Sequence, residues 1–134
     1  MSGATVRYFV LDLDESVSFY RDLLEFEVEL RPSPFFAMLY RGDLRLLLSV
    51  PGGGPGGGAP MPDGTTPAPG GWNRFAIQVT DLDATVRGLA SKGAQFRNEI
   101  VSGTGVRQIL LADPSGNLVE LYQPLAAYHE PPGS

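Results

Sequence analysis

One short pattern occurs twice in this chain, with a constant spacing between the copies. The pattern Val10-x-Asp12-Leu13-Asp14-x-x-Val17 returns as Val79-x-Asp81-Leu82-Asp83-x-x-Val86, so each matching residue lies 69 positions after its counterpart. Self-similarity at a fixed spacing indicates copies of one structural unit. The fold is therefore expected to consist of two similar modules.

In both copies the pattern marks the junction between a strand and a helix. The apolar and β-branched runs 5–11 and 74–79 precede the first Asp of each copy and predict strands. Asp12 and Glu15 have the spacing of a helix capping box, and Lys92-Gly93 predicts a helix end. Apolar residues recur at helical spacing between these signals, at Leu13, Val17, Tyr20 and Leu24 in the first copy and at Leu82, Val86 and Leu89 in the second.

Three short strands are expected after each helix. Their predicted ranges are 26–31, 35–41 and 44–50 in the first copy and 95–101, 106–112 and 117–123 in the second. The predicted fold class is therefore α+β, with two βαβββ modules. Residues 1–134 are expected to form a single domain, made of module one (4–50), a linker (51–71), module two (72–124) and a tail (125–134).

The linker is rich in glycine and proline. Residues 51–71 hold nine of the 17 glycines and six of the 12 prolines. Such a segment buries few apolar side chains and sustains neither a helix nor a central strand, so we expect a flexible spacer or a mobile flap. It does not match a phosphate-binding loop, because no Gly-Lys-Ser/Thr sequence follows its glycines.

Composition narrows the function classes. The chain has no cysteine, which excludes disulfides, thiolate metal sites and a cysteine nucleophile. Its net charge of −5 argues against a nucleic-acid partner and mildly favours neutral or cationic ligands. Neither a secretory leader nor an apolar run of membrane-spanning length is present, so a cytoplasmic protein without a membrane partner is expected.

The segment Asp113-Pro114-Ser115-Gly116-Asn117 predicts a tight turn that leads into the last strand. In that strand Leu118, Glu120 and Tyr122 share one face, because side chains alternate along a strand. Glu120 is anomalous there. A carboxylate beside Leu and Tyr needs a hydrogen bond, an ion pair or a metal, unless it lies at a strand edge in solvent.

The duplicated βαβββ pattern, the segment 12–24 with its Phe19-Tyr20-Arg21-Asp22-Leu23-Leu24 sequence, and the closing segment 113–121 resemble the vicinal oxygen chelate superfamily. This is the fold of glyoxalases, bleomycin-resistance proteins and extradiol dioxygenases, and the resemblance covers about residues 5–124. It implies that the sheets of the two modules curl into a cleft and that the protein is a homodimer. In metal-dependent members, His, Glu or Gln occupies the first and last strands of each module.

At the positions that the resemblance implies, the chain departs from a metal site. The first-strand ligand lies seven residues before the Asp that starts the helix, at Thr5 and Arg74, and the last-strand ligand lies four residues after the turn glycine, at Leu46 and Glu120. Among these four, only Glu120 suits a metal, and a divalent ion needs several ligands. The lone histidine, His129, belongs to the tail and is expected to be solvated. Neither a metal nor another cofactor is therefore expected.

The resemblance makes the strands of Arg74 and Glu120 neighbours, so the two side chains are expected to face each other and form a bidentate ion pair. The guanidinium would then take the place of the metal's charge. Such a pair either contributes to ligand binding or only secures the sheet, and both interpretations stay open.

Strand parity adds further candidates for ligand binding. Arg7 and Phe9 share a face with Thr5, Gln78 shares one with Arg74, and Tyr122 shares one with Glu120. Trp72 enters module two from the linker, and Phe36 and Met38 lie on the third strand of module one. Aromatic side chains at such positions stack on flat ligands or belong to the core.

Two classes of function follow. The preferred one is a metal-free protein without catalytic residues that binds a small organic ligand, an aromatic or cationic compound such as an antibiotic. The alternative is a metal-dependent lyase, isomerase or dioxygenase of the same superfamily, or an enzyme that uses Glu120 as a metal-free acid or base. A single histidine provides neither a Ser/His/Asp nor a Cys/His set, and Glu120 beside an arginine should stay ionised and weakly basic.

Overall fold

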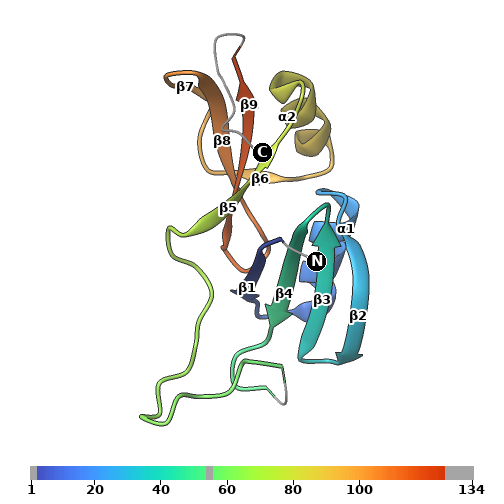
Figure 1. The fold of residues 1–134 in the computed structure, drawn as a ribbon, viewed down its shortest axis with the longest axis vertical. Helices are drawn as coiled ribbons and strands as arrows, with labels where there is room; N and C mark the ends of the chain where they lie inside the picture. Colours follow the sequence, from blue (N-terminus) through green and yellow to red (C-terminus); the bar gives the residue numbers. More distant parts are fainter. Residues whose placement is uncertain (1–2, 54–55, 126–134) are drawn as a thin grey trace. The chain divides into compact units, whose positions relative to one another are not determined.

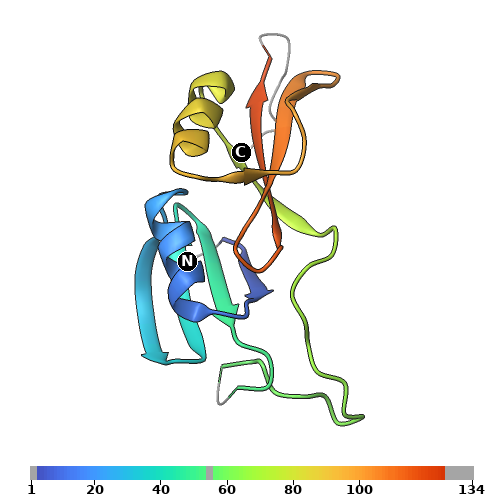
Figure 2. The same cartoon turned by 180° about the vertical axis from the view of Figure 1, so that it is seen from behind.

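The computed structural model describes residues 3–53 and 56–125, and the chain divides into two compact units. The first unit runs up to Asn73 and includes the turn Asp113–Asn117. The second comprises Arg74–Ala112 and the chain from Leu118 onward. In each unit one helix packs on one face of one sheet, as Figures 1 and 2 show from opposite sides. We call the other face of each sheet its open face.

The first unit contains a four-stranded sheet, sheet A, in the order β1-β4-β3-β2. Its elements are β1 (Thr5–Phe9), α1 (Leu13–Asp22), β2 (Glu27–Ser33), β3 (Phe36–Arg41) and β4 (Leu44–Ser49). Strand β1 is parallel to β4, and the other pairs are antiparallel. Leu39, Leu46 and Leu48 are fully buried, and Arg41, which shares their face, donates from Nε to Leu24 O just beyond α1 at 3.0 Å. The core of this unit therefore lies between sheet A and α1.

The second unit contains a five-stranded sheet, sheet B, in the order β5-β9-β8-β6, with β7 also paired to β8. Its elements are β5 (Arg74–Gln78), α2 (Leu82–Ser91), β6 (Gln95–Phe96), β7 (Val101–Ser102), β8 (Val106–Ala112) and β9 (Leu118–Pro124). Strand β5 is parallel to β9. The two βαβββ modules predicted from the sequence are thus confirmed.

One predicted strand differs. Residues 95–101 form two short strands, β6 and β7, instead of one. Asn98 is the physical reason, because its side-chain Oδ1 accepts the Leu110 amide at 3.0 Å, in the place of a backbone carbonyl. Its Nδ2 donates to the carbonyl of Glu99 at 2.7 Å. The side chain thus interrupts the backbone ladder between β6 and β8.

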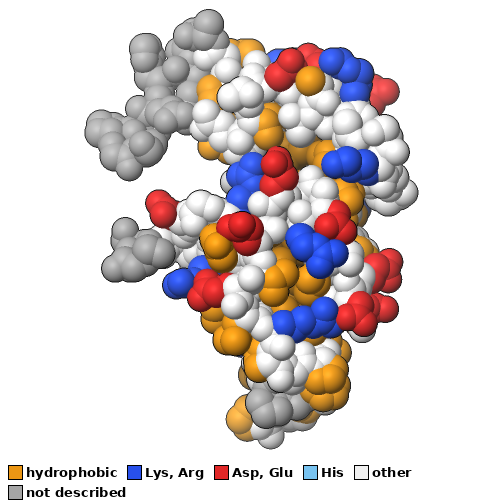
Figure 3. All heavy atoms as spheres, turned by 90° about the vertical axis from the view of Figure 1, so that its right-hand side faces the viewer, with side chains coloured by type: hydrophobic (Ala, Val, Ile, Leu, Met, Phe, Trp, Pro, Cys, Tyr) orange, Lys and Arg blue, Asp and Glu red, His pale blue; other side chains and the backbone are white. Residues whose placement is uncertain are grey.

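Charged side chains of opposite sign lie next to one another on the surface (Figure 3). The ion pairs Arg21–Asp22, Arg45–Glu29 and Arg31–Asp14 belong to the first unit, and Arg107–Asp83 belongs to the second. Exposed pairs of this kind contribute little to stability, so the buried apolar residues hold the fold together.

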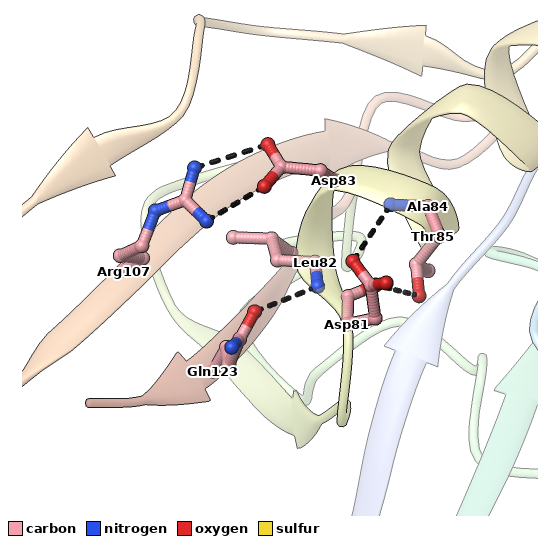
Figure 4. A network of polar contacts seen from close by, with 7 residues as sticks. All are labelled: Asp81, Leu82, Asp83, Ala84, Thr85, Arg107 and Gln123. Atoms are coloured by element: carbon pink, nitrogen blue, oxygen red, sulfur yellow. Dashed lines mark hydrogen bonds and ion pairs between the residues drawn. The ribbon is translucent and has the colours of Figure 1, made fainter. Parts of the chain in front are cut away.

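The start of α2 is capped by Asp81 and is fixed to sheet B by Gln123 and Arg107 (Figure 4). Asp81 is the N-cap and accepts the Ala84 amide at 3.0 Å. Gln123 Oε1 on β9 accepts the Leu82 amide at 2.8 Å, and Arg107 on β8 makes two hydrogen bonds to Asp83. The residues of β8 and β9 that share the parity of Arg107 and Gln123 therefore face the helix.

The turn Asp113–Asn117 has the chemistry expected from its sequence. Asp113 is buried, and its Oδ1 accepts the amides of Ser115 and Asn117, both at 2.9 Å. Its Oδ2 accepts the Tyr20 hydroxyl at 2.8 Å and Asn117 Nδ2 at 2.9 Å. Asn117 also donates to Phe9 O at 2.8 Å. Four donors thus satisfy the carboxylate of a buried Asp.

The linker makes specific contacts with sheet A where it leaves β4. Ser49 Oγ donates to Gly56 O at 2.5 Å, and Gly52 N donates to Gly58 O at 2.7 Å. A Cβ on Gly57, whose φ is +92°, would lie 1.7 Å from Arg7 Nη1. Farther along, Met61 N donates to Thr65 O. Glycine is needed at 57 for both conformation and space, and the mobility of the linker stays a prediction.

The sequence also predicts a solvated His129 in the tail and no membrane-spanning segment. His129 lies outside the described residues. In the described part of the chain, no helix is long and apolar enough to cross a membrane.

Candidate functional site

A polar cluster occupies the open face of sheet B. The residues that face α2 on its three long strands are apolar and mostly buried, including Phe75, Ile77, Ile109, Leu111, Val119 and Leu121. The alternate residues point away from the helix, and five of them are polar or charged: Arg74, Gln78, Gln108, Glu120 and Tyr122. Four of these five were predicted as ligand-binding residues from the sequence.

Arg74 and Glu120 form the predicted ion pair. The Nη2 atom of Arg74 lies 3.0 Å from Glu120 Oε1, and its Nε donates to the same oxygen at 3.1 Å. The side chains are 30% and 19% exposed, so the pair is only partly buried. The ion pair is confirmed, and both of these contacts go to the same oxygen, Oε1.

Arg74 and Glu120 lie diagonally across the β5–β9 ladder and not directly opposite each other. The residue directly opposite Arg74 in the parallel ladder is Leu118, and the residue opposite Glu120 is Ala76. The expectation that the two face each other directly was therefore wrong by two residues. A long guanidinium side chain spans this diagonal, which is why the ion pair still forms.

Gln108 is a third member of the cluster, and it was not predicted from the sequence. With its amide nitrogen toward the carboxylate, Gln108 Nε2 donates to Glu120 Oε2 at 2.9 Å and to Oε1 at 3.3 Å. The opposite orientation would place the amide oxygen against the carboxylate oxygens. Counting residues outward from the turn Asp113–Asn117 along β8 and β9 would have placed Gln108 opposite Tyr122, because the two are register partners.

Tyr122 and Gln78 lie at the other end of this open face. The Tyr122 hydroxyl is 3.4 Å from Gln78 Oε1, which is long for a hydroxyl hydrogen bond. Gln78 is exposed and Tyr122 is half-buried. Both side chains therefore reach the surface of sheet B.

The residues at the metal-ligand positions of the resembled superfamily do not fit a metal. Arg7 and Ala76 are equivalent residues of the two modules, because they are 69 positions apart. Arg7 pairs with Leu47 and Ala76 pairs with Glu120, so Leu47 in the first module corresponds to Glu120 in the second. The assignment of Leu46 was wrong: Leu46 is fully buried and shares the helix-facing side of Leu39 and Leu48. Leu47 has no ligating atom either.

Charge leads to the same conclusion. The guanidinium of Arg74 lies against Glu120, and a second cation beside it would be repelled. Within the described ranges 3–53 and 56–125, no three His, Cys, Asp or Glu side chains group closely enough to hold a metal ion. The side chains thus supply neither the number nor the charge of ligands that a divalent metal requires.

The open face of sheet A carries the remaining predicted residues in three rows across the strands. The first row contains Thr5, Arg45 and Tyr40, the second Arg7, Leu47 and Met38, and the third Phe9, Ser49 and Phe36. Arg7 and Phe9 share a face with Thr5, as predicted, and the register places Phe36 and Met38 on the same face. Trp72, at the end of the linker, is 64% exposed.

A cavity of about 310 Å³ lies at the first row. Thr5, Glu29, Tyr40 and Arg45 contribute to its wall, together with Gly3 and Asp43. Arg45 Nε donates to Glu29 Oε1 at 3.1 Å. The hydrogen bond to Glu27, followed by the charge of that carboxylate, raises the pKa of the Tyr40 phenol. The cavity belongs to the first unit and the Arg74–Glu120 pair to the second. The lining of the cavity contains none of the residues predicted to bind a ligand.

Comparison with known proteins establishes the family. Residues 4–121 match the Glyoxalase/Bleomycin resistance protein/Dioxygenase superfamily, and the chain belongs to it. No curated protein matches the chain.

Solved structures share the fold at low sequence identity. A lactoylglutathione lyase from Agrobacterium tumefaciens is 22% identical with a TM-score of 0.71, and the match covers 91% of this chain and 92% of that one. TnmS3, an antibiotic binding protein from Streptomyces sp. CB03234, is 21% identical with a TM-score of 0.71 and coverages of 93% and 97%. TioX from Micromonospora sp. ML1 is 22% identical with a TM-score of 0.70 and coverages of 93% and 100%.

Proposed function

We propose that the protein binds a small organic molecule without a metal, and that the ligand is an aromatic or cationic compound such as an antibiotic. The observation that carries the proposal is the side-chain set at the superfamily's metal positions. Thr5, Leu47 and Arg74 stand at three of them, and Glu120 at the fourth is engaged by Arg74 and Gln108. A site of this composition retains hydrogen-bonding groups and a flat sheet surface, but not a metal's ligand set.

The family supports this ligand class. The chain belongs to a superfamily whose name includes bleomycin-resistance proteins, and TnmS3, which shares the fold, is an antibiotic binding protein. Antibiotics and related aromatic natural products are therefore the first compounds to test.

The proposed binding residues lie on the two open faces. On sheet B, Arg74, Glu120, Gln78 and Tyr122 supply polar contacts, and Gln108 joins them. On sheet A, Arg7, Phe9, Phe36 and Met38 supply a mainly apolar surface, and Trp72 offers an exposed ring near the start of β5. A few polar groups beside an apolar surface are typical of small-molecule sites.

We further propose that the protein is a cytoplasmic homodimer. The edge strand β2 supports the dimer, because its Val28 and Leu30 are 40% and 49% exposed. Light scattering of the purified protein gives the mass in solution, and a monomer across the accessible concentration range would overturn this part of the proposal.

The function is tested by metal analysis combined with a thermal-shift screen. Protein purified without chelator should carry no stoichiometric zinc, iron, manganese or nickel after dialysis. A ligand that binds only the folded state raises the melting temperature, so at least one aromatic or cationic compound should do so in a concentration-dependent way. Stoichiometric metal whose removal lowers the melting temperature would overturn the proposal.

One observation favours an enzyme as the second candidate. Glu120 is a carboxylate at a metal-ligand position, and its side chain is 19% exposed on an open face. An enzyme that used this carboxylate would lose turnover in Glu120→Gln while still binding its substrate. If mass spectrometry shows that a ligand found in the screen is chemically unchanged after incubation with the protein, this result would argue against the enzyme.

A further inference from the structure

The open face of sheet A changes in character from one row to the next. The first row is polar and acidic, with Tyr40 and Arg45 beside Glu27, the register partner of Tyr40. The second row contains the apolar side chains of Leu47 and Met38, with Arg7 on β1 at its end, where Nη1 of Arg7 would lie 1.7 Å from a Cβ on Gly57 of the linker. The third row, with Ser49 and Phe36, is where the linker touches the sheet, at Gly56. A ligand that lies along β3 and β4 would therefore meet the acidic row first and then the apolar side chains of Met38 and Leu47.

The cavity of about 310 Å³ lies at the acidic end. Its wall contains one aromatic ring, Tyr40, and two carboxylates, Glu29 and Asp43. Gly3 closes one side, because a Cβ there would lie 2.3 Å from Asp43 O. The cavity is large enough for a small organic group, and its lining combines a ring face with charged groups.

The charge balance of the cavity is negative. Its one arginine, Arg45, is paired with Glu29, with Nε–Oε1 and Nη2–Oε2 distances of 3.1 and 3.4 Å. Asp43 lies in the same wall, and Glu27, the register partner of Tyr40, adds a further negative charge on the neighbouring strand. Two carboxylates thus line the cavity together with one guanidinium. An ammonium group is attracted by this arrangement and by the face of the Tyr40 ring, whereas an anion is repelled.

We propose that this cavity binds the protonated amine of an amphiphilic organic cation, whose apolar body lies along Leu47 and Met38. The inference rests on the proposed function and narrows its ligand class.

The strand geometry sets the length of such a ligand. Residues two apart on a strand share a face and lie about 7 Å from each other. The step from Tyr40 to Met38 on β3, and from Arg45 to Leu47 on β4, therefore separates the acidic row from the apolar row by about that distance. The matching ligand has an amine joined to a ring by a chain of roughly three carbons, which spans this separation.

The test uses three probes that share one apolar body: 3-phenylpropylamine, 3-phenylpropan-1-ol and 3-phenylpropionate. Each is titrated into ¹⁵N-labelled protein at neutral pH, and amide chemical shifts are followed. The amine should bind most tightly and the carboxylate least, because only the charge of the head group differs. Shifts should concentrate at Thr5, Tyr40, Asp43 and Arg45, and extend to Leu47 and Met38.

Variants separate the roles of charge and ring. Asp43→Asn should weaken binding of the amine about 2- to 5-fold, as expected for a partly exposed charge pair, and leave binding of the alcohol unchanged. Tyr40→Leu should weaken the amine by a similar factor, whereas Tyr40→Phe keeps the ring face and should retain most of the binding. The matched control is Glu99→Gln, which removes one exposed acidic charge in the second unit and should have no effect.

Several results would overturn the inference. These are equal binding of the alcohol or the carboxylate, no saturable shift with the amine, shifts confined to sheet B, or an effect of Asp43→Asn no greater than that of Glu99→Gln. A screening compound that binds at Gln108 and Tyr122 while the cavity amides stay still would remove this inference and leave the proposed function standing. Stoichiometric structural metal would remove the proposed function itself.

Discussion

Glu120 is a carboxylate at a metal-ligand position of the superfamily. Its position next to Leu118 and Tyr122 raised the question of what satisfies a carboxylate on a sheet face. In the structure Arg74 lies against Oε1, and Gln108, with its amide nitrogen turned toward the carboxylate, donates to both oxygens. The carboxylate is therefore satisfied by protein groups alone, and it needs no metal to be stable there.

Arg74→Ala should destabilise the protein more than Glu120→Gln does. The first change removes the cation and leaves Glu120 with Gln108 as its donor, whereas the second keeps an oxygen that accepts from Arg74. We expect a loss of about 1–2 kcal/mol for Arg74→Ala, less than for a fully buried pair, because both side chains are partly exposed. Urea unfolding measures it, with Arg21→Ala as an exposed control. An unchanged midpoint for Arg74→Ala would show that the pair contributes nothing to stability.

Tyr20→Phe should cost about 1–3 kcal/mol at pH 7, because it removes a buried hydrogen bond to Asp113. Burial, followed by the charge of Asp113, raises the pKa of Tyr20 well above its usual value. As the pH rises above about 10, the unfolded chain releases this proton first, so the stability present below that pH is lost. Unfolding midpoints at pH 9 and 11 should therefore fall less in Tyr20→Phe than in the unmodified protein. An equal fall in both proteins would contradict the assignment to Tyr20.

At the scale of single elements, two acidic residues at the start of α2, two positions apart, have different roles. Asp81 caps the helix by accepting a backbone amide, whereas Asp83 pairs with Arg107 at the surface (Figure 4). A cap satisfies a donor that the helix itself leaves free, and an exposed ion pair is screened by water.

Asp81→Ala should therefore lower the unfolding free energy by about 1 kcal/mol, and Asp83→Asn should change it little. Asp12→Ala in α1 is the matched variant, since Asp12 accepts the Glu15 amide at the same 3.0 Å distance. Circular dichroism during urea unfolding provides the measurement. Equal losses from Asp81→Ala and Asp83→Asn would show that the ion pair matters as much as the cap.

The elements that the sequence predicts well are those whose signals are local. The caps at Asp12 and Asp81 and the apolar stripes behind them place both helices, and the turn at Asp113–Asn117 places β9. The break between β6 and β7 was not predictable in this way, because it depends on Asn98 reaching the amide of a distant residue, Leu110.

The candidate site shows the same distinction. Parity along one strand correctly grouped Arg74 with Gln78, but the position equivalent to Glu120 in the first module was placed one residue too early. Leu47 lies five positions after Gly42, whereas Glu120 lies four positions after Gly116. Counting from the turn glycine therefore does not identify equivalent residues in the two modules. The register between parallel strands corrects it, and that register is a tertiary property.

At the scale of the whole molecule, the linker should exchange its amide hydrogens faster than the sheets do. Its described backbone hydrogen bonds are isolated turns, such as Met61 N to Thr65 O and Gly64 N to Met61 O, and not a ladder. Isolated, exposed hydrogen bonds open easily. Hydrogen exchange of the free protein should show little protection for residues 59–66 and strong protection for β4 and β9. Protection of the linker equal to that of β4 would contradict the prediction.

The place of the turn Asp113–Asn117 has a consequence for how the chain is made. The turn belongs to the first unit, where Asp113 accepts the hydroxyl of Tyr20, 93 positions earlier, and Asn117 donates to Phe9 O, 108 positions earlier. On the ribosome, α1 and β1 emerge long before these partners, and at about 5–20 residues per second the delay lasts several seconds. During that time the first half of the chain exists without Asp113 and Asn117, the partners of Tyr20 and Phe9 in the folded unit. Folding of this unit is completed only when residues 113–117 have been synthesised.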